Sequence, residues 1–386
     1  MKIDIPQGSA PTNDTEALVL SGLLDMTSTS RDRRFGFYIP IHSQLCIELF
    51  GWNYKKAICE LSRRGLVEVN NKYSAGRFPK SYRLKDRWRL PFTEEYTLRK
   101  GNRKLRIRIE QDDEIGNLLV QKFNQFYLPE VAQGWDGFNG RQIQRADYYA
   151  VRCKYGRLHT SFTGLKRESR TRLQTIDNQH LIEIDVVNCQ PLLAGVIVKQ
   201  NVQSTSTICW DMRSENFIEL CSKGQVYETL LEEIRRTMSY RDLLTGSPYQ
   251  ERYRHRPVNR KDVKNQFLIM MFAENDTMRK MPIFQYVRKL WPVIAKAIQE
   301  IKEHQYQKLA WDCQRFESKI MIDGVCSRVF RTSPETILIT IHDGILTTAD
   351  KSELVHGCIR REFSQFGIVP TVNEKILDIS PSIANN

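Results

Sequence analysis

The chain of 386 residues lacks the long apolar runs and the closely spaced cysteines that mark membrane proteins and zinc or redox proteins. No segment approaches the ~20 consecutive apolar residues of a membrane-spanning helix, and residues 1–16 lack the apolar core of a secretion signal. The nine cysteines are odd in number and include no Cys-x-x-Cys pair. We therefore expect a folded cytoplasmic protein with reduced thiols.

Acidic residues are scarce in one region of the chain. Overall, 58 Lys and Arg stand against 45 Asp and Glu, a formal charge of +13, but residues 51–110 alone hold 17 basic and 6 acidic residues. Aromatic residues lie among these charges, namely Tyr54, Tyr73, Phe78, Tyr82 and Trp88. This mixture is typical of proteins that bind a phosphate backbone, although a solvated basic face would look the same.

Residues 36–90 carry two helix patterns followed by a hairpin pattern, the order of a winged helix. Ser43 and Asn53 precede the two helices as expected N-caps, and Gly65 stands where a left-handed C-terminal residue belongs. The residues expected to meet nucleic acid are Lys55, Lys56, Arg63 and Arg64 on the second helix and Lys72, Arg77 and Lys80 in the wing. Winged helices also bind proteins, so that alternative stays open.

The rest of the chain has no internal repeat. Residues 91–150 read as a charged, partly helical connector, and residues 181–189 and 336–348 read as a strand and a strand hairpin. Helix patterns cover 211–238, 258–275 and 283 to about 330.

Two aspartates stand at the ends of apolar strand patterns. Asp185 follows residues 181–184, and Asp343 follows residues 337–342. A carboxylate at a strand end is held rigidly at the margin of a sheet, as a divalent-metal ligand needs to be. If the strands are neighbours, the two carboxylates could share two metal ions. The alternative is that Asp343 and Gly344 form only a hairpin turn.

A helix pattern at 255–275 places Arg260, Lys264 and Phe272 within about 120 degrees of one face. Two cations one turn apart suit a triphosphate, and an aromatic ring suits a base or a sugar. The alternative is a basic amphipathic helix whose Phe272 lies in the core.

Taken in this order, the three segments resemble the polymerase motifs shared by family A DNA polymerases and single-subunit phage and mitochondrial RNA polymerases. The similarity covers about residues 150–386. Residues 156–173 resemble the stretch that precedes the first motif in family A, where an arginine lies near the primer terminus.

The resemblance implies an α+β fold, a right-hand polymerase palm and fingers with an N-terminal winged-helix-like domain. The expected parts are the winged-helix-like domain at 1–90, a connector in the place of a thumb at 91–150, palm segments at 151–200 and 335–386, and fingers at 201–334.

The resemblance also implies roles for single residues. Asp185, Asp343 and the Val186 carbonyl would bind two Mg²⁺ ions, or Mn²⁺ in their place. The catalytic set would be completed by Lys264, which would act on the pyrophosphate. The nucleotide would contact Arg260, Lys264, Phe272 and Gln190, and the nucleic acid would contact Arg172 and His342. The expected partners are a template, a primer and nucleoside triphosphates, with no membrane.

Two departures from the family pattern bear on the activity. Gln190 stands where family A DNA polymerases carry a glutamate that crowds the sugar 2′ position, and Gly344 replaces the acidic residue that usually follows the second aspartate. The sequence favours a DNA polymerase with a modest preference for dNTPs. An RNA polymerase or primase, and a DNA-binding replication initiator or regulator with an inactive palm, remain as alternatives.

Overall fold

The computed structural model describes residues 2–29, 38–41, 43–72, 79–85, 93–99, 107–129, 137–146, 148–205, 209–237 and 257–377. Helices and short strands mix throughout these residues, and the strands form small sheets. No helix within the described ranges is both long enough and apolar enough to cross a membrane.

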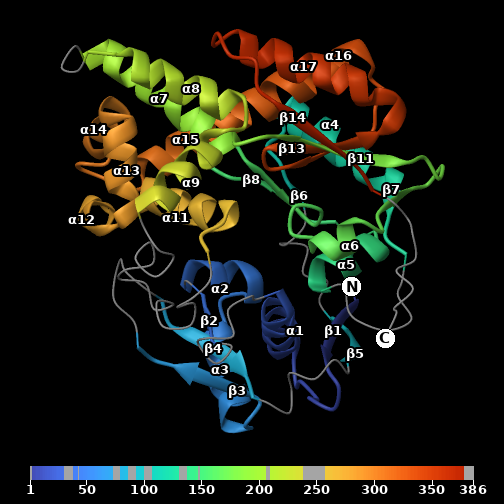
Figure 1. Cartoon of the computed structure of the whole chain (residues 1–386). Helices are drawn as coiled ribbons and strands as arrows, with labels where there is room; N and C mark the ends of the chain where they lie inside the picture. Colours follow the sequence, from blue (N-terminus) through green and yellow to red (C-terminus); the bar gives the residue numbers. More distant parts are fainter. Residues whose placement is uncertain are drawn as a thin grey trace.

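An N-terminal module, drawn in blue to teal in Figure 1, packs around its own apolar core. Its elements are β1 (Lys2–Pro6), α1 (Asp14–Thr29), β2 (Ile39–Pro40), α2 (Ser43–Phe50), α3 (Tyr54–Arg63), β3 (Val67–Asn70), β4 (Ser81–Leu84) and β5 (Thr93–Thr97). Strands β2, β4 and β3 form an antiparallel sheet in that order, and β5 pairs with β1. Leu98 belongs to this core, so the module continues past the expected boundary at residue 90.

The spacing of apolar residues explains α3, the second of the two predicted helices. Its buried residues fall at the helical spacing of three and four, namely Tyr54, Ala57, Ile58 and Leu61. Gly65 ends the helix with φ +74°, as predicted, and the Leu66 N–H donates to the Leu61 carbonyl at 2.9 Å. Asn53 is the N-cap residue, but its side chain makes no capping hydrogen bond. Ser43 is the first residue of α2.

A connecting region links this module to the rest of the chain. Its elements are β6 (Ile107–Arg108), α4 (Glu114–Gln121), a 3₁₀ turn (Lys122–Gln125), β7 (Phe126–Tyr127), α5 (Gly137–Gln144), β8 (Ala150–Arg152), β9 (Leu158–Thr160), α6 (Arg167–Arg170) and β10 (Gln174–Thr175). The nearly buried Asp4 of β1 pairs with Arg141 at 3.3 Å and with Arg145 at 3.5 Å. These ion pairs join the N-terminal module to α5.

A four-stranded antiparallel sheet holds the two aspartates singled out by the sequence. Its order is β12 (Leu338–Ile341), β13 (Gly344–Thr348), β11 (Leu181–Val186) and β14 (Val372–Ile376). The register places Asp185 opposite Gly344 on one side and opposite Asn373 on the other. Helix α17 (Ser352–Ser364) packs against β11, as Figure 1 shows near the top. The predicted strand and hairpin are confirmed.

Helices make up most of the chain between β11 and β12. They are α7 (Cys189–Thr205), α8 (Met212–Ser222), α9 (Val226–Thr237), α11 (Arg260–Phe272), α12 (Asn275–Lys280), α13 (Pro282–Leu290), α14 (Pro292–Ile301), α15 (Lys308–Ser318), a π-helical segment (Lys319–Cys326) and α16 (Ser327–Thr332). The helix expected over 211–238 is split, because Gly224 takes a φ of +76°. The helix expected from 283 is also broken, first before Pro292, which opens α14.

Lys302, at the end of α14, fixes the end of α11. Its side chain is 2% exposed, and its Nζ donates to the carbonyls of Met270, Met271 and Ala273 at 2.9–3.3 Å. Burial lowers the pKa of Lys302 to about 8. The last carbonyls of a helix have no partner within that helix, so this lysine supplies one.

Replacing Lys302 with Met should lower the free energy of unfolding by about 2 kcal/mol, because buried carbonyls lose their donor. Urea denaturation measures this, with Lys296→Met on the exposed side of the same helix as the matched control. Equal losses in the two variants would contradict the anchoring role of Lys302.

Candidate active site

The two aspartates lie on neighbouring strands. Asp185 is near the end of β11, and Asp343 lies in the short turn between β12 and β13. The Val186 N–H donates to the Asp343 carbonyl at 3.4 Å. The strands are therefore adjacent, which is the condition that a shared metal site requires, and Asp343 also lies in the hairpin turn that was the alternative reading. His342 enters this turn with a φ of +56°.

Gly344 keeps space open beside the first aspartate. A Cβ atom at this position would lie 3.2 Å from the Ile184 carbonyl oxygen and 3.5 Å from Oδ1 of Asp185. A larger side chain would meet both the strand and the carboxylate. The absence of the acidic residue expected from the family pattern therefore leaves Asp185 uncrowded.

The electrostatics of the site favour a bound cation. Burial raises the pKa of Asp185, and the negative charges of Asp343 and Glu183 raise it further. Burial also raises the pKa of Asp343, while the positive charge of Lys264 lowers the pKa of both aspartates. Arg170 pairs with Glu183 at 2.7 Å. Two carboxylates that lie close together repel each other, and the nearby positive charge offsets this repulsion only in part. A bound divalent ion would stabilise such a pair.

The oxygen donors suit Mg²⁺ or Mn²⁺ bound together with a phosphate. Within the part of the chain that the structure describes, no group of three or more His, Cys, Asp or Glu side chains is arranged to hold a metal. Mg²⁺ commonly uses one or two carboxylates and takes its other ligands from water and substrate phosphates. Asp185 and Asp343 fit that pattern, and the Val186 carbonyl is the expected third protein ligand.

Helix α11 carries the two cations that the sequence analysis singled out. Its start is fixed by a capping box in which the Asn259 side chain and the Asp262 side chain bond each other's backbone N–H groups. Arg260, in the first turn, pairs with Glu228 and lies 5.3 Å from the ring centroid of Tyr227. Lys264 is exposed one turn later. Its positive charge lowers the pKa of both aspartates.

Phe272 lies at the far end of α11. Its side chain is half-buried and packs against the main hydrophobic core. This is the core packing that the sequence left as the alternative to base stacking.

A buried glutamate that the sequence analysis missed joins the candidate site. Glu317 of α15 is 1% exposed and accepts two hydrogen bonds from Arg157, at 2.9 and 2.6 Å. It also accepts a hydrogen bond from the Gln190 amide. Burial raises the pKa of Glu317, and Arg157 lowers it. A signal was present in the sequence, because Leu309 and Cys313 precede Glu317 at intervals of four on the buried face.

The β8–β9 hairpin delivers Arg157 to this glutamate. Gly156 takes a φ of +82°, and a Cβ there would lie 3.0 Å from the Ser318 Cβ. Arg152 donates to the Gly156 carbonyl at 2.9 Å and pairs with Asp113 and Asp323. The turn therefore packs tightly where α15 passes into the π-helical segment.

The basic residues predicted on α3 divide into two groups. Lys55 and Lys56 are exposed, and Arg63 pairs with Glu60 at 2.7 Å while its side chain stays 74% exposed.

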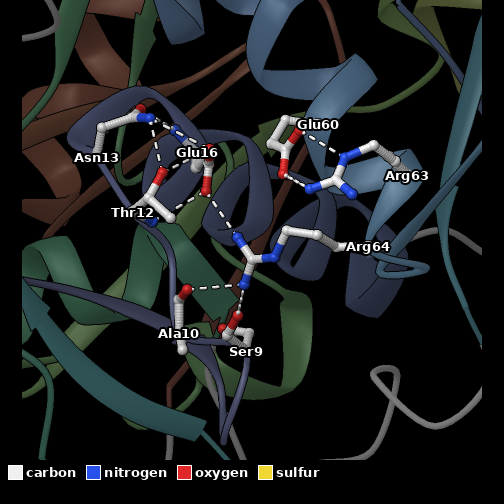
Figure 2. Close-up of polar contacts among 8 residues, drawn as sticks. All are labelled: Ser9, Ala10, Thr12, Asn13, Glu16, Glu60, Arg63 and Arg64. Atoms are coloured by element: carbon white, nitrogen blue, oxygen red, sulfur yellow. Dashed lines mark hydrogen bonds and ion pairs between the residues drawn. The ribbon is translucent and has the colours of Figure 1, made fainter.

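Arg64, in contrast, is used inside the N-terminal module, as Figure 2 shows. Its guanidinium donates to the buried Glu16 carboxylate at 2.9 Å and to the carbonyls of Ser9 and Ala10 at 2.9 and 2.8 Å. These bonds tie the end of α3 to the segment before α1 and to the first turn of α1. They occupy the groups that a phosphate contact would need, so the expected nucleic-acid role of Arg64 is replaced by a structural one.

The other residues predicted to contact nucleic acid differ in exposure and in hydrogen bonding. Arg77 lies outside the described residues, and Lys72 is exposed. Lys80 donates to Asn71 at 3.0 Å, and Arg172 donates to the Pro129 carbonyl at 2.9 Å. His342 is exposed in the turn beside Asp343.

Comparison with known proteins does not assign this chain to a family. No protein-family model and no curated protein matches the chain. Among solved structures, the chain is similar to the POL domain of Pol1 from M. smegmatis in complex with DNA primer-template and dNTP, with a TM-score of 0.24 and 12% identity. The match covers 60% of this chain and 47% of that chain, so this protein matches about half of its neighbour's length. Likeness at this level does not establish fold or function, so the proposals below rest on the site.

The Arg157–Glu317 pair predicts a strong dependence of stability on both partners. Arg157→Met should cost about 3–5 kcal/mol, because it leaves a buried carboxylate without its cation, and Arg157→Met/Glu317→Met should recover most of that loss. Urea denaturation of the single and double variants measures the coupling. Arg279→Met, at an exposed ion pair on α12, is the control and should change little. A double variant less stable than Arg157→Met would argue against the account.

Proposed function

We propose that this protein is a template-directed nucleotidyltransferase of the DNA polymerase type. The observation that carries the proposal is the placement of Asp185 and Asp343 on adjoining strands, where the positive charge of Lys264 lowers the pKa of both. In the proposed arrangement the four-stranded sheet of β12, β13, β11 and β14 is the palm, and the helices around α11 are the fingers. The site combines oxygen ligands for metal with cations for a triphosphate.

Asp185, Asp343 and the Val186 carbonyl would hold the metal ions. When bound, these ions would activate the attacking 3′ hydroxyl and stabilise the charge on the phosphates. In the reaction that oxygen loses its proton to water and forms a bond to the α-phosphorus, while the bond from the α-phosphorus to the pyrophosphate oxygen breaks. Lys264, which is exposed, would neutralise the charge that develops on the pyrophosphate or give it a proton.

Arg260 would bind the triphosphate by exchanging one anion for another. Its guanidinium now pairs with Glu228 and lies over the Tyr227 ring. A triphosphate carries more charge than one carboxylate, so it would compete for this arginine. The ring beneath would keep the guanidinium in place during the exchange.

The N-terminal module is proposed to be a winged helix that binds nucleic acid. Its order of helix, strand, two helices and a strand hairpin supports this reading. The exposed Lys55, Lys56 and Arg63 of α3, and the exposed Lys72 after β3, would meet phosphates.

Gln190 is proposed to lie against the sugar of the incoming nucleotide. Its amide nitrogen is held by Glu317, so the side chain is fixed in one orientation. We expect a modest preference for dNTPs and expect Gln190→Gly to raise incorporation of ATP more than it lowers that of dATP. The measurement is the ratio of kcat/KM for dATP and ATP; a wild-type preference for ATP would favour an RNA polymerase or primase.

Asp185→Asn and Asp343→Asn should each reduce nucleotide addition more than about a thousandfold while the protein stays folded, because each removes a metal ligand without removing bulk. Extension of a labelled primer with dNTPs and Mg²⁺ measures this. Asp276→Asn, an exposed aspartate on α12, is the control and should extend normally.

Two results would count against the proposal. Near-normal extension by either folded variant would exclude the two-aspartate site. A wild-type protein that binds primer–template but adds no nucleotide with dNTPs or NTPs would favour an initiator or regulator with an inactive palm.

A further inference from the structure

One face of α15 carries a row of basic side chains and a tryptophan. The members of this row are Lys308, Trp311, Arg315 and, at the start of the π-helical segment, Lys319. At about 100° and 1.5 Å per residue they fall within about 80° of one face and span about 16 Å. The other side of the same helix is buried through Leu309, Cys313 and Glu317.

The β8–β9 turn adds a second aromatic ring and another cation to this face. Tyr155 stacks on Trp311 with ring centroids 5.5 Å apart and planes 19° apart. Lys154 Nζ lies 5.0 Å from the Tyr155 centroid and 5.6 Å from the Trp311 centroid. Arg315 lies 5.3 Å from the Tyr155 centroid. The two rings hold the cations in place while leaving N–H groups available.

Positive charge on this face is largely uncompensated. Asp312 pairs with Lys308 at 2.6 Å and with Arg315 at 3.0 Å. Lys154 and Lys319 are exposed, and neither forms an ion pair or a side-chain hydrogen bond within the described ranges of the chain. One carboxylate thus faces four cations, and the excess favours an external polyanion.

The β8–β9 turn connects this face to residues of the candidate active site that lie on the buried side of α15. Tyr155 stands two residues before Arg157, and Arg157 pairs with Glu317 on the buried side of α15. Glu317 in turn holds Gln190. On the other flank lies a cavity of about 530 Å³, whose cations are Arg315 and Lys319 and whose carboxylate is Asp312. Polar residues of α7 line it as well, namely Gln200, Asn201 and Ser204, together with the apolar Ile197 and Phe316. Amides, hydroxyls and cations together suit phosphate oxygens.

We propose that this α15 surface, formed by Lys154, Tyr155, Lys308, Trp311, Arg315 and Lys319, binds the phosphate backbone of the nucleic acid on which the active site works. The proposal rests on the proposed function for the identity of that partner. A strand of duplex DNA carries one charge per 3.4 Å, so a 16 Å row spans about four or five phosphates. The surface would hold the nucleic acid independently of the N-terminal module.

The test removes the two unpaired lysines. Lys154→Ala/Lys319→Ala should weaken binding of a fluorescent primer–template duplex about tenfold or more near 0.1 M salt and reduce the log–log salt slope by about 1.8. Fluorescence anisotropy without nucleotide measures both quantities over a series of salt concentrations. Trp311→Leu should weaken binding in the same direction, because the cations lose a supporting ring.

Two comparisons make the test specific. Lys289→Ala/Lys296→Ala removes the same charge from α13 and α14, where each lysine lies near a glutamate, and should leave the slope within about 0.5 of wild type. Lys154→Arg/Lys319→Arg should bind like wild type, because the charges are kept.

The outcomes separate this proposal from the proposed function. If the wild-type protein binds duplex and extends primers, but Lys154→Ala/Lys319→Ala binds duplex as tightly as the charge-matched control, the proposed role of the α15 surface is wrong and the proposed function stands. If the alanine variant lowers the salt slope of duplex binding but the wild-type protein adds no nucleotides, the α15 surface binds nucleic acid and the polymerase proposal is wrong. Displacement of the duplex by polyglutamate as readily as by unlabelled duplex would assign the surface to an acidic protein and overturn the proposal.

Discussion

The pairing of β11 with β13 is the constraint on which the rest of the site depends. It sets Asp185 beside the turn that carries Asp343, so that the two carboxylates lie in the same partly buried site. Such a pair is costly unless positive charge is near. Lys264 from α11 supplies part of that charge, and the remaining need is what a divalent ion would meet.

The surrounding structure holds this arrangement rigid. Gly344 keeps the strand pairing close and leaves Asp185 uncrowded. The capping box at Asn259 and the anchor at Lys302 fix the two ends of α11, so that its cations keep their direction. The Arg157–Glu317 pair joins the β8–β9 hairpin to α15 and orients Gln190. A site for phosphoryl transfer requires neighbouring residues of this kind, which hold its side chains in fixed positions.

Local patterns allowed much of this to be predicted from the sequence. The strands that carry Asp185 and Asp343 show as short apolar runs, and α11 shows as a helix with two cations one turn apart. The contacts of Glu317 could not be predicted, because they join segments about 160 and 127 residues away in sequence. Arg64 was misjudged for the same reason, since its partner Glu16 lies 48 residues earlier. The break at Gly224 was visible as a glycine inside a helix pattern.

Metal binding in the absence of catalysis tests the central claim most directly. Titration of the protein with Mn²⁺, followed by electron paramagnetic resonance or calorimetry, should show binding that tightens when a nucleoside triphosphate is present. The account predicts that Asp343→Asn weakens this binding at least about tenfold, because half of the carboxylate set is lost. Equal Mn²⁺ affinity in wild type and in the variant, with and without nucleotide, would contradict it.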